Sequence, residues 1–457
     1  MSRVVKRMKL SKLIELSGTR IQACLNGDMS IREIITQLSA YRYAAKHMSI
    51  NLDRLDKYTQ NGLRDSNHMF SFKFTNMKEK EVTECIFKAI SARFSQNEYQ
   101  TLVQQAKGMV ESYADELSIM WLLDAETFAM SGGLFVLSYN IRQLCIGKLI
   151  KKYEHREKVH YFDVQRLYAS YLSVNEPENA MKVLGRASKL WIRHHDEIRQ
   201  LMSVFARQGK LGEILPPKEF NNKAEKAFHK LVHGKRVAII GPANERLDVD
   251  EITREFDLVI VLNYRGNEFL CEDVRRCGVD ISYYNELYRL NHVSSESFSL
   301  ETEAQYFRDI KMAVFKSLDS DFQINMFREN RCRKLPGLER IFLYQGFCNL
   351  MQNVLVDLFS FAPARIKVFR TNLFLAEAGK RYQKEYVAGE IELQLKEKES
   401  ALNAIRLQNY AMHNLISNYE ITKYWYDVGY FEADEGLAKI LSLGTSEYCH
   451  RMELLEF

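Results

Sequence analysis

The apolar and polar positions of this chain follow one pattern before residue 218 and another after it. Through the first 176 residues, which contain no proline, apolar residues recur at intervals of three and four positions, as they do in residues 99–123. This spacing places apolar side chains on one face of a helix. The pattern therefore predicts an all-helical region over residues 1–218.

A pattern with a period of 34 residues occurs near the end of this region, over residues 161–215. The positions at which tetratricopeptide-like hairpins pack large and small side chains are filled by Tyr171, Ala180, Leu184 and Ala187. A second copy follows, in which Leu167, Tyr171 and Ala180 recur as Leu201, Phe205 and Ile214. Two copies need further helices to bury their faces. A tetratricopeptide-like stack completed by upstream helices and a generic helical bundle therefore both stay open.

Pro216 and Pro217 end the helical pattern, and short continuous apolar runs follow them. Five runs of strand length occur, at residues 236–241, 257–264, 280–285, 311–315 and 365–374. Such runs, joined by helical crossovers, are typical of a mostly parallel sheet that is covered on both faces. Residues 219–457 are therefore predicted to form an α/β domain that binds its ligand at the carboxyl ends of the strands.

A tight turn, Gly241-Pro242-Ala243-Asn244, follows the first predicted strand. A dinucleotide site at such a turn requires GxGxxG and an acidic residue about 20 positions later. Here a single glycine precedes a proline, and the second strand ends at Asn263 instead of a carboxylate. The phosphate-binding pattern GxxxxGK[ST] does not occur either. The turn therefore indicates a smaller ligand with one phosphate rather than a nicotinamide or flavin cofactor.

Asparagines follow three successive predicted strands, at Asn244, Asn263 and Asn285. An amide both donates and accepts hydrogen bonds, so three amides at one edge of a sheet suit a neutral nucleoside. Asparagine at the end of a strand is also ordinary turn chemistry. Both interpretations remain open at this point.

Residues 234–435 resemble sialyltransferases in the order of three motifs. Residues 236–288 resemble the large sialylmotif, with a strand, a glycine turn and two further strands that end near asparagines. Residues 343–374 resemble the small sialylmotif, with Gly346 in the glycine position, and His413 and Glu420 are similar to the very small motif. Bacterial lipooligosaccharide sialyltransferases show the same order. The sequence departs from animal enzymes at Pro242-Ala243, before Gly346, and in the wider spacing from His413 to Glu420.

The resemblance implies a Rossmann-like glycosyltransferase that moves a 2-keto-3-deoxy acid sugar, sialic acid or Kdo, from CMP to a surface polysaccharide or lipopolysaccharide. It implies nucleotide binding by Gly241, Pro242, Asn244, Asn263, Asn285, Gly346, Thr371 and Asn372. Thr371 and Asn372 would donate to the departing phosphate, with Tyr382 and Tyr386 close behind them in the chain. A monophosphate donor needs no divalent ion, so neither metal nor cofactor is expected. The DxD-like Asp319-Ser320-Asp321 is accordingly interpreted as a capped loop.

His413 is the expected catalytic base. The unperturbed pKa of histidine, about 6.5, lets it accept a proton from an acceptor hydroxyl at neutral pH. Asn414 or Glu420 is expected to orient its ring, and His292 is the reserve candidate. Inversion needs only a base, whereas retention by double displacement needs a carboxylate nucleophile. Both outcomes stay open, and the carboxylates near predicted strand ends are Asp248 and Glu286.

Composition bears on the compartment and the partners. A net charge of +5 over 457 residues calls for no nucleic acid partner. Eight cysteines without CxxC spacing indicate neither a disulfide framework nor a zinc site. No apolar run approaches the ~18 residues of a membrane span, and the N-terminus lacks the apolar core of a secretory signal, so a cytoplasmic protein is expected. Peripheral association with the inner face of a membrane is favoured by Arg3, Lys6, Arg7, Lys9 and Lys12.

A function from a different class is also compatible with the sequence. In it, the helical repeats recruit protein partners and the α/β domain is a degenerate nucleotide sensor without catalysis. In the enzyme hypothesis, the helical region instead binds the glycan or glycolipid acceptor or a protein partner. The response of the protein to CMP separates the two hypotheses.

Overall fold

The structure of the 457-residue chain is a computed structural model. It describes residues 74–94, 99–160, 163–189, 192, 202–203, 205, 222–284, 309–316, 331–335, 343–376 and 413–455. The chain forms two compact units. The helical unit comprises the described parts of residues 1–157, 397–416 and 446–457, and the sheet unit those of residues 158–396 and 417–445.

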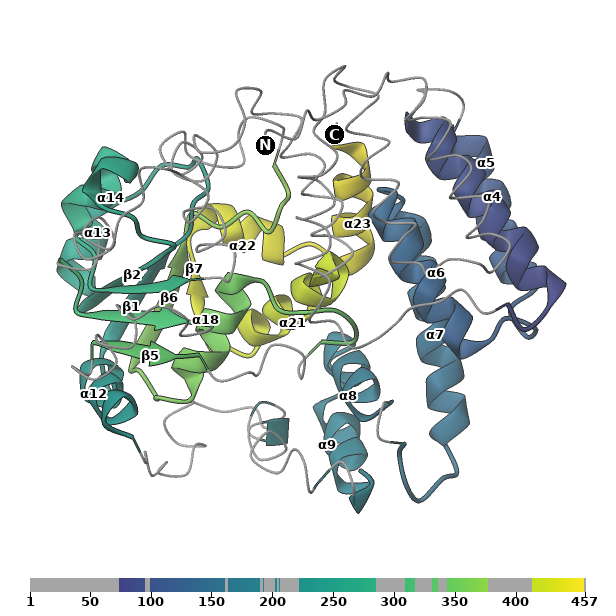
Figure 1. The fold of residues 1–457 in the computed structure, drawn as a ribbon, viewed down its shortest axis with the longest axis horizontal. Coiled ribbons are helices and arrows are strands. Elements are labelled where there is room, and N and C mark those ends of the chain that lie inside the picture. Colours follow the sequence, from purple (N-terminus) through teal and green to yellow (C-terminus); the bar gives the residue numbers. More distant parts are fainter. Residues whose placement is uncertain are drawn as a thin grey trace, which may run out of the picture. The chain divides into compact units, whose positions relative to one another are not determined.

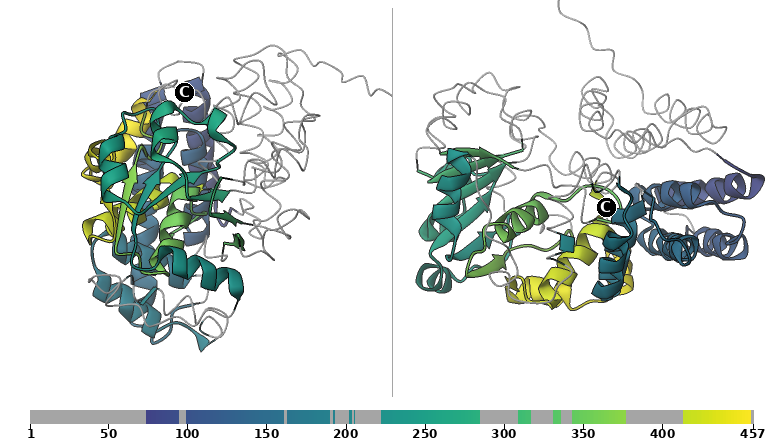
Figure 2. Two further views of the ribbon diagram at one scale, coloured as in Figure 1. Left: turned by 90° about the vertical axis from the view of Figure 1, so that its left-hand side faces the viewer. Right: turned by 90° about the horizontal axis from the view of Figure 1, so that it is seen from below.

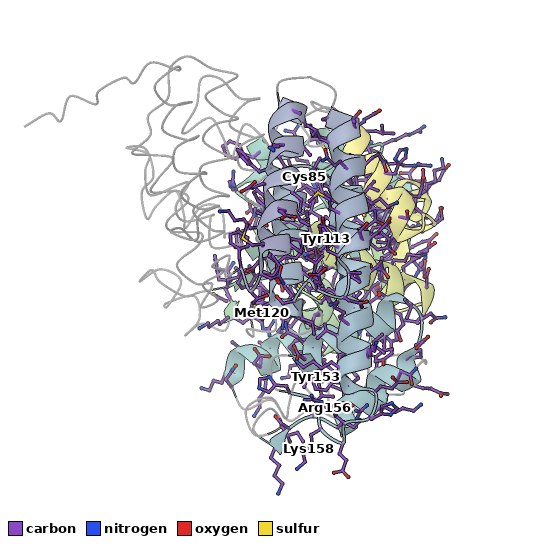
Figure 3. All side chains as sticks on the ribbon, turned by 90° about the vertical axis from the view of Figure 1, so that its right-hand side faces the viewer. Cys85, Tyr113, Met120, Tyr153, Arg156 and Lys158 are labelled. Atoms are coloured by element: carbon purple, nitrogen blue, oxygen red, sulfur yellow. The ribbon has the colours of Figure 1, made fainter. Side chains whose placement is uncertain are left out.

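The helical unit contains α4 (Met77–Phe94), α5 (Tyr99–Ser112), α6 (Ile119–Ser131), α7 (Phe135–Tyr153) and most of α23 (Thr445–Leu454). Figure 3 shows α4 to α7 with their side chains; Cys85 of α4 is buried and Met120 at the start of α6 is exposed. The C-terminal helix belongs to this unit because Arg93 of α4 donates to the carbonyl oxygen of Glu453 (2.7 Å). The Glu453 carboxylate also accepts from the backbone N–H of Val136 (2.8 Å).

A seven-stranded sheet forms the centre of the sheet unit, and all its strand pairs are parallel (Figure 1). The strands are β1 (Arg236–Ile240), β2 (Leu258–Leu262), β3 (Ile281–Tyr284), β4 (Met312–Phe315), β5 (Cys332–Lys334), β6 (Arg365–Phe369) and β7 (Glu432–Ala433). The five predicted strands are confirmed. The sequence pattern missed β5 and β7, because strands of three and two residues are too short to form an apolar run.

Helices cover both faces of the sheet (Figures 1 and 2). On one face, Ala238, Ile240 and Tyr284 share a buried cluster with residues of α13 (Val249–Glu255) and α14 (Glu272–Cys277). Neighbouring residues of a strand point to opposite faces. Tyr283 accordingly meets the opposite layer, which includes α12 (Lys223–Val232) and α18 (Leu350–Phe359). The remaining elements are α21 (Leu415–Asp427), α22 (Glu435–Leu441) and the 3-10 helix η2 (Asn267–Phe269).

Two helices form where the first copy of the 34-residue pattern was predicted, α8 (Val164–Ser173) and α9 (Pro177–Gly185). Ala180 and Leu184 of α9 are buried. Pro177 occupies the first turn of α9, where its missing N–H costs no hydrogen bond. Leu201, Ile214 and the predicted boundary at Pro216-Pro217 lie outside the described residues.

The compact units divide the chain after residue 157, and the segment that follows joins the sheet unit. The boundary at residue 218 stays a prediction. Phe205 shows why the segment joins the sheet unit. Its ring packs edge-on against Phe359 at the end of α18 (5.4 Å between centroids) and lies 6.0 Å from the rings of Trp425 and Tyr430. Tyr424 also donates to the carbonyl oxygen of Phe205 (3.2 Å). A buried aromatic cluster therefore attaches this part of the chain to the sheet unit.

Candidate functional site

The order of the strands reverses between β1 and β6. From β1 the sheet continues in one direction through β2, β3, β4 and β5, and in the other direction through β6 and β7. Open parallel sheets bind ligands at the carboxyl ends of the strands beside such a reversal. The loops that follow β1 and β6 therefore form the candidate site, together with the neighbouring loop after β2.

Gly241, directly after β1, packs against the loop after β6. A Cβ atom at position 241 would overlap both the carbonyl oxygen of Arg370 and Oγ1 of Thr371. The two loops are also joined by backbone hydrogen bonds from Gly241 to Phe369 (2.8 Å) and from Ala243 to Arg370 (3.0 Å). The glycine is thus required for the close approach of these loops. A direct contact of Gly241 with a nucleotide stays a prediction.

Strained backbone gathers at this edge of the sheet. Of the seven residues other than glycine that have a positive φ in the described ranges, four follow β2 or β6: Asn263 (54°), Arg370 (52°), Leu373 (45°) and Phe374 (69°). The left-handed conformation costs about 1–2 kcal/mol for an ordinary residue, and such conformations concentrate at functional sites. The N–H of Asn263 donates to the carbonyl oxygen of Tyr283 (2.8 Å), so β3 holds this asparagine in place.

Arg370 ties four segments of the site together. Its Nε donates to the carbonyl oxygen of Glu245, Nη1 to Sγ of Cys271 (2.9 Å) and Nη2 to the carboxylate of Asp273 (3.3 Å). Its backbone N–H donates to the carboxylate of Asp434 (2.7 Å), the residue that caps α22. The buried guanidinium therefore joins the loop after β6 to the loop after β1 and the start of α14, and the backbone N–H of Arg370 joins it to the loop after β7. The sequence reasoning did not single out this arginine.

Glu245 is a second residue that the sequence reasoning missed. Its half-buried carboxylate lies against α22, where a Cβ atom on Gly436 would be 2.5 Å from Oε2. Burial raises the pKa of the Glu245 carboxyl, and the negative charge of Asp434 raises it further; the Arg370 guanidinium has a smaller, opposite effect. Glu245 directly follows the predicted Asn244, so its place beside the turn was visible in the sequence, whereas its burial was not.

The loop that carries Gly346 is held by α21. Gly346 has a φ of 84°, a conformation that favours glycine. Asn418 of α21 accepts from the backbone N–H of Asn349 (2.9 Å) and donates to the carbonyl oxygen of Phe347 (3.0 Å). The N–H of Gln345 donates to Ser417 (3.4 Å). These contacts fix the loop immediately before α18.

The structure brings together part of the predicted nucleotide-binding set. Gly241 contacts Thr371, and Asn372, the next residue in the chain, is buried. Pro242 and Asn244 lie on the turn after β1, and Asn244 is exposed. Asp248 caps α13, because its side chain accepts from the N–H of Glu251 (2.9 Å). The predictions that lie outside the described residues are Asn285, Glu286, His292, Asp319-Ser320-Asp321, Tyr382 and Tyr386.

His413 and Glu420 belong to different units. His413 is half-buried in the helical unit, and Glu420 is a buried residue of α21 in the sheet unit. Asn414, which was expected to orient the histidine, donates to the buried Glu126 of α6 (2.9 Å) and accepts from the buried Arg142 of α7 (3.3 Å). Its amide is therefore engaged within the helical unit. The roles of His413 and Glu420 stay predictions.

Comparisons with known proteins give no indication of the function of this chain. No family model, no curated protein and no solved structure matches this chain. Within the described ranges, no three His, Cys, Asp or Glu side chains are grouped as metal ligands would be. In the same ranges, no helix combines the length and the apolar character that crossing a bilayer requires.

Proposed function

We propose that this protein is a glycosyltransferase that moves a 2-keto-3-deoxy acid sugar, sialic acid or Kdo, from a CMP donor to a surface polysaccharide or lipopolysaccharide acceptor. The observation that carries the proposal is the reversal of strand order beside β1. Residues on the adjoining loops, Gly241, Asn263 and Thr371, are those that the sialyltransferase resemblance selects. The proposal thus rests on two observations. The site lies where parallel sheets bind nucleotides, and its residues belong to motifs that resemble those of sialyltransferases.

In this proposal the sheet is the Rossmann-like part of the enzyme. The helices α8 and α9 begin a tetratricopeptide-like region that binds the glycan or glycolipid acceptor or a protein partner. The enzyme acts in the cytoplasm, where the basic residues near the N-terminus favour peripheral contact with the anionic inner face of a membrane. A surface glycan that grows at this face would then be within reach.

The proposed chemistry needs three contributions from the chain. Amide groups such as that of Asn263 bind the cytidine, because an amide both donates and accepts hydrogen bonds. Thr371 and Asn372, together with backbone N–H groups, donate to the single phosphate as it takes up charge. His413 accepts the proton of the acceptor hydroxyl while the acceptor oxygen bonds to the anomeric carbon of the sugar.

CMP is expected to stabilise the protein against heat, and UDP, GDP and NAD are not. At a concentration 100 times its Kd, a ligand raises the free energy of unfolding by about 2.7 kcal/mol. Asn263→Gly is expected to weaken this response, because it removes the amide while glycine accepts the left-handed backbone of position 263. Thermal-shift titration measures both effects.

The matched control is Asn175→Gly. Asn175 also has a left-handed backbone (φ 57°), but it is exposed in the connection between α8 and α9. Its variant is expected to respond to CMP like the wild type. Equal responses of all three proteins would remove Asn263 from the site, and a wild type that responds to no nucleotide would favour the non-catalytic scaffold.

His413→Ala is expected to slow the release of CMP from CMP-Neu5Ac or CMP-Kdo by about 10²–10⁴-fold, the usual contribution of a general base. Incubation of each donor with an acceptor extract, followed by chromatography of free CMP, measures the rate and identifies the donor. The control is His155→Ala, since His155 is almost fully exposed. Equal release by His413→Ala and the wild type would contradict the assigned base.

A further inference from the structure

Glu245 and the proposed phosphate donors are held by the same arginine. The Arg370 guanidinium donates to the carbonyl oxygen of Glu245, and Thr371 and Asn372 directly follow Arg370 in the chain. The backbone of Glu245 is further fixed by its N–H, which donates to the carbonyl oxygen of Ala243 (3.0 Å). The carboxyl group of Glu245 is thereby placed on the loop after β1, next to the loop after β6 that would bind the departing phosphate.

The neighbouring carboxylates already have structural partners. Asp434 accepts from the N–H groups of Arg370 (2.7 Å) and Leu437 (2.8 Å), so it joins the loop after β6 to the start of α22. Asp248 caps α13, and Asp273 accepts from the Arg370 side chain. In the described part of the chain, no hydrogen-bond donor contacts the carboxylate oxygens of Glu245. Its carboxyl group is therefore available for a substrate.

The surroundings of Glu245 favour its protonated form. Burial is the main cause of its raised pKa, and the carboxylate of Asp434 is the second. The Arg370 guanidinium is the charged group that acts in the opposite direction, but it is already shared among the carbonyl oxygen of Glu245, Cys271 and Asp273. Glu245 consequently keeps its proton at a higher pH than an exposed glutamate does.

We propose that Glu245 is the general acid that protonates the departing phosphate, an inference that rests on the proposed function. The bond between the anomeric carbon and the phosphate oxygen breaks, its electron pair stays on that oxygen, and the oxygen takes the proton of Glu245. The acceptor oxygen bonds to the anomeric carbon, and its proton passes to the general base of the proposed reaction. Glu245 then regains a proton from water, and the base returns one to water.

Glu245→Gln is expected to lower kcat for CMP release by about 10²–10⁴-fold and to change CMP affinity far less, since the amide keeps the shape but transfers no proton. In the wild type, the active form has Glu245 protonated, so kcat falls on the alkaline side of its pH profile. In the variant this alkaline fall is expected to disappear. The release of CMP from the active donor, CMP-Neu5Ac or CMP-Kdo, is followed across pH.

Stability gives a readout independent of turnover. The pKa of Glu245 is raised in the folded state, so its ionised form destabilises the fold above that pKa and has no such effect at low pH. Glu245→Gln is therefore expected to raise Tm at about pH 8 and to leave Tm unchanged at about pH 4. A Tm at about pH 8 that falls in the variant would contradict the raised pKa of Glu245 on which the acid role depends.

The matched control is Glu255→Gln, at the other edge of the sheet. Glu255 accepts from Nη1 of Arg365 (3.0 Å), and this bond lowers the pKa of its carboxyl. Its replacement is expected to lower Tm at about pH 8 and to leave CMP release unchanged. Suppose that the wild type binds and releases CMP and that Glu245→Gln has the same rate and pH profile. The acid role of Glu245 is then overturned, and the proposed function stands. A wild type that neither binds nor releases CMP overturns the proposed function as well.

Discussion

Asp357→Leu is expected to lower the free energy of unfolding of the sheet unit by about 3–5 kcal/mol, because it leaves the buried Arg333 without its main counter-charge. Both side chains are only 1% exposed. The Asp357 carboxylate accepts from Nη1 of Arg333 and from the hydroxyl of Tyr283 (2.7 Å). Urea unfolding followed by circular dichroism measures the loss.

Aromatic packing explains why water cannot replace the lost carboxylate. The Arg333 guanidinium packs against the rings of Phe228 (4.6 Å to the centroid) and Phe361 (4.9 Å), which themselves meet edge-on with their centroids 4.7 Å apart. Its remaining acidic partner is Glu225 on α12 (2.9 Å). A charge enclosed in this way is costly when it loses a partner, whereas a neutral, well-packed replacement of both partners is often tolerated.

A double-mutant cycle tests this account. Asp357→Leu combined with Arg333→Met is expected to lose less stability than Asp357→Leu alone. The control is Lys439→Ala, which breaks a largely exposed ion pair with Glu435 and is expected to leave the stability almost unchanged. Additive losses in the double variant would show that the two side chains do not act as a pair.

Gly241→Ala is expected to destabilise the sheet unit by about 1–3 kcal/mol and to abolish its response to CMP. The new methyl group would overlap the carbonyl oxygen of Arg370 and Oγ1 of Thr371, so the loops after β1 and β6 must separate. The backbone hydrogen bonds between these loops would then lengthen or break. Thermal unfolding with and without CMP measures the stability and the response together.

The control for this variant is Gly185→Ala, at the end of α9, where a Cβ atom would meet no other described segment of the chain within 4 Å. This alanine has open space around it and is expected to leave the CMP response intact. If Gly241→Ala binds CMP as the wild type does, the close approach of the two loops is not needed for the site.

The sequence predicted best what local patterns determine. The strands β1 to β4 and β6 consist of continuous apolar residues, and their burial follows directly from that composition. Asn263 could be selected because it ends such a strand, and its left-handed backbone is one that asparagine tolerates better than most residues. The reversal of strand order, in contrast, depends on β6 pairing with β1 across more than a hundred residues.

The parts of the site that the sequence did not reveal depend on contacts between distant segments. The partners of the Arg370 side chain, Glu245, Cys271 and Asp273, lie about a hundred positions or more earlier in the chain. The predicted strand over residues 365–374 contains Arg370 but gives no indication of the groups that its guanidinium contacts. The raised pKa of Glu245 likewise depends on distant contacts, first on the burial of its carboxyl and then on the charge of Asp434, which lies far later in the chain.

The interleaving of the two units affects synthesis of the protein. Their boundaries, at 157/158, 396/397, 416/417 and 445/446, make the chain pass from one unit to the other four times. The helix that completes the first unit contains Glu453, which is translated 360 residues after its partner Arg93. The early helices therefore keep part of their apolar surface uncovered until these 360 residues have been translated. Nascent chains of this protein are accordingly expected to bind chaperones, which cover exposed apolar surface.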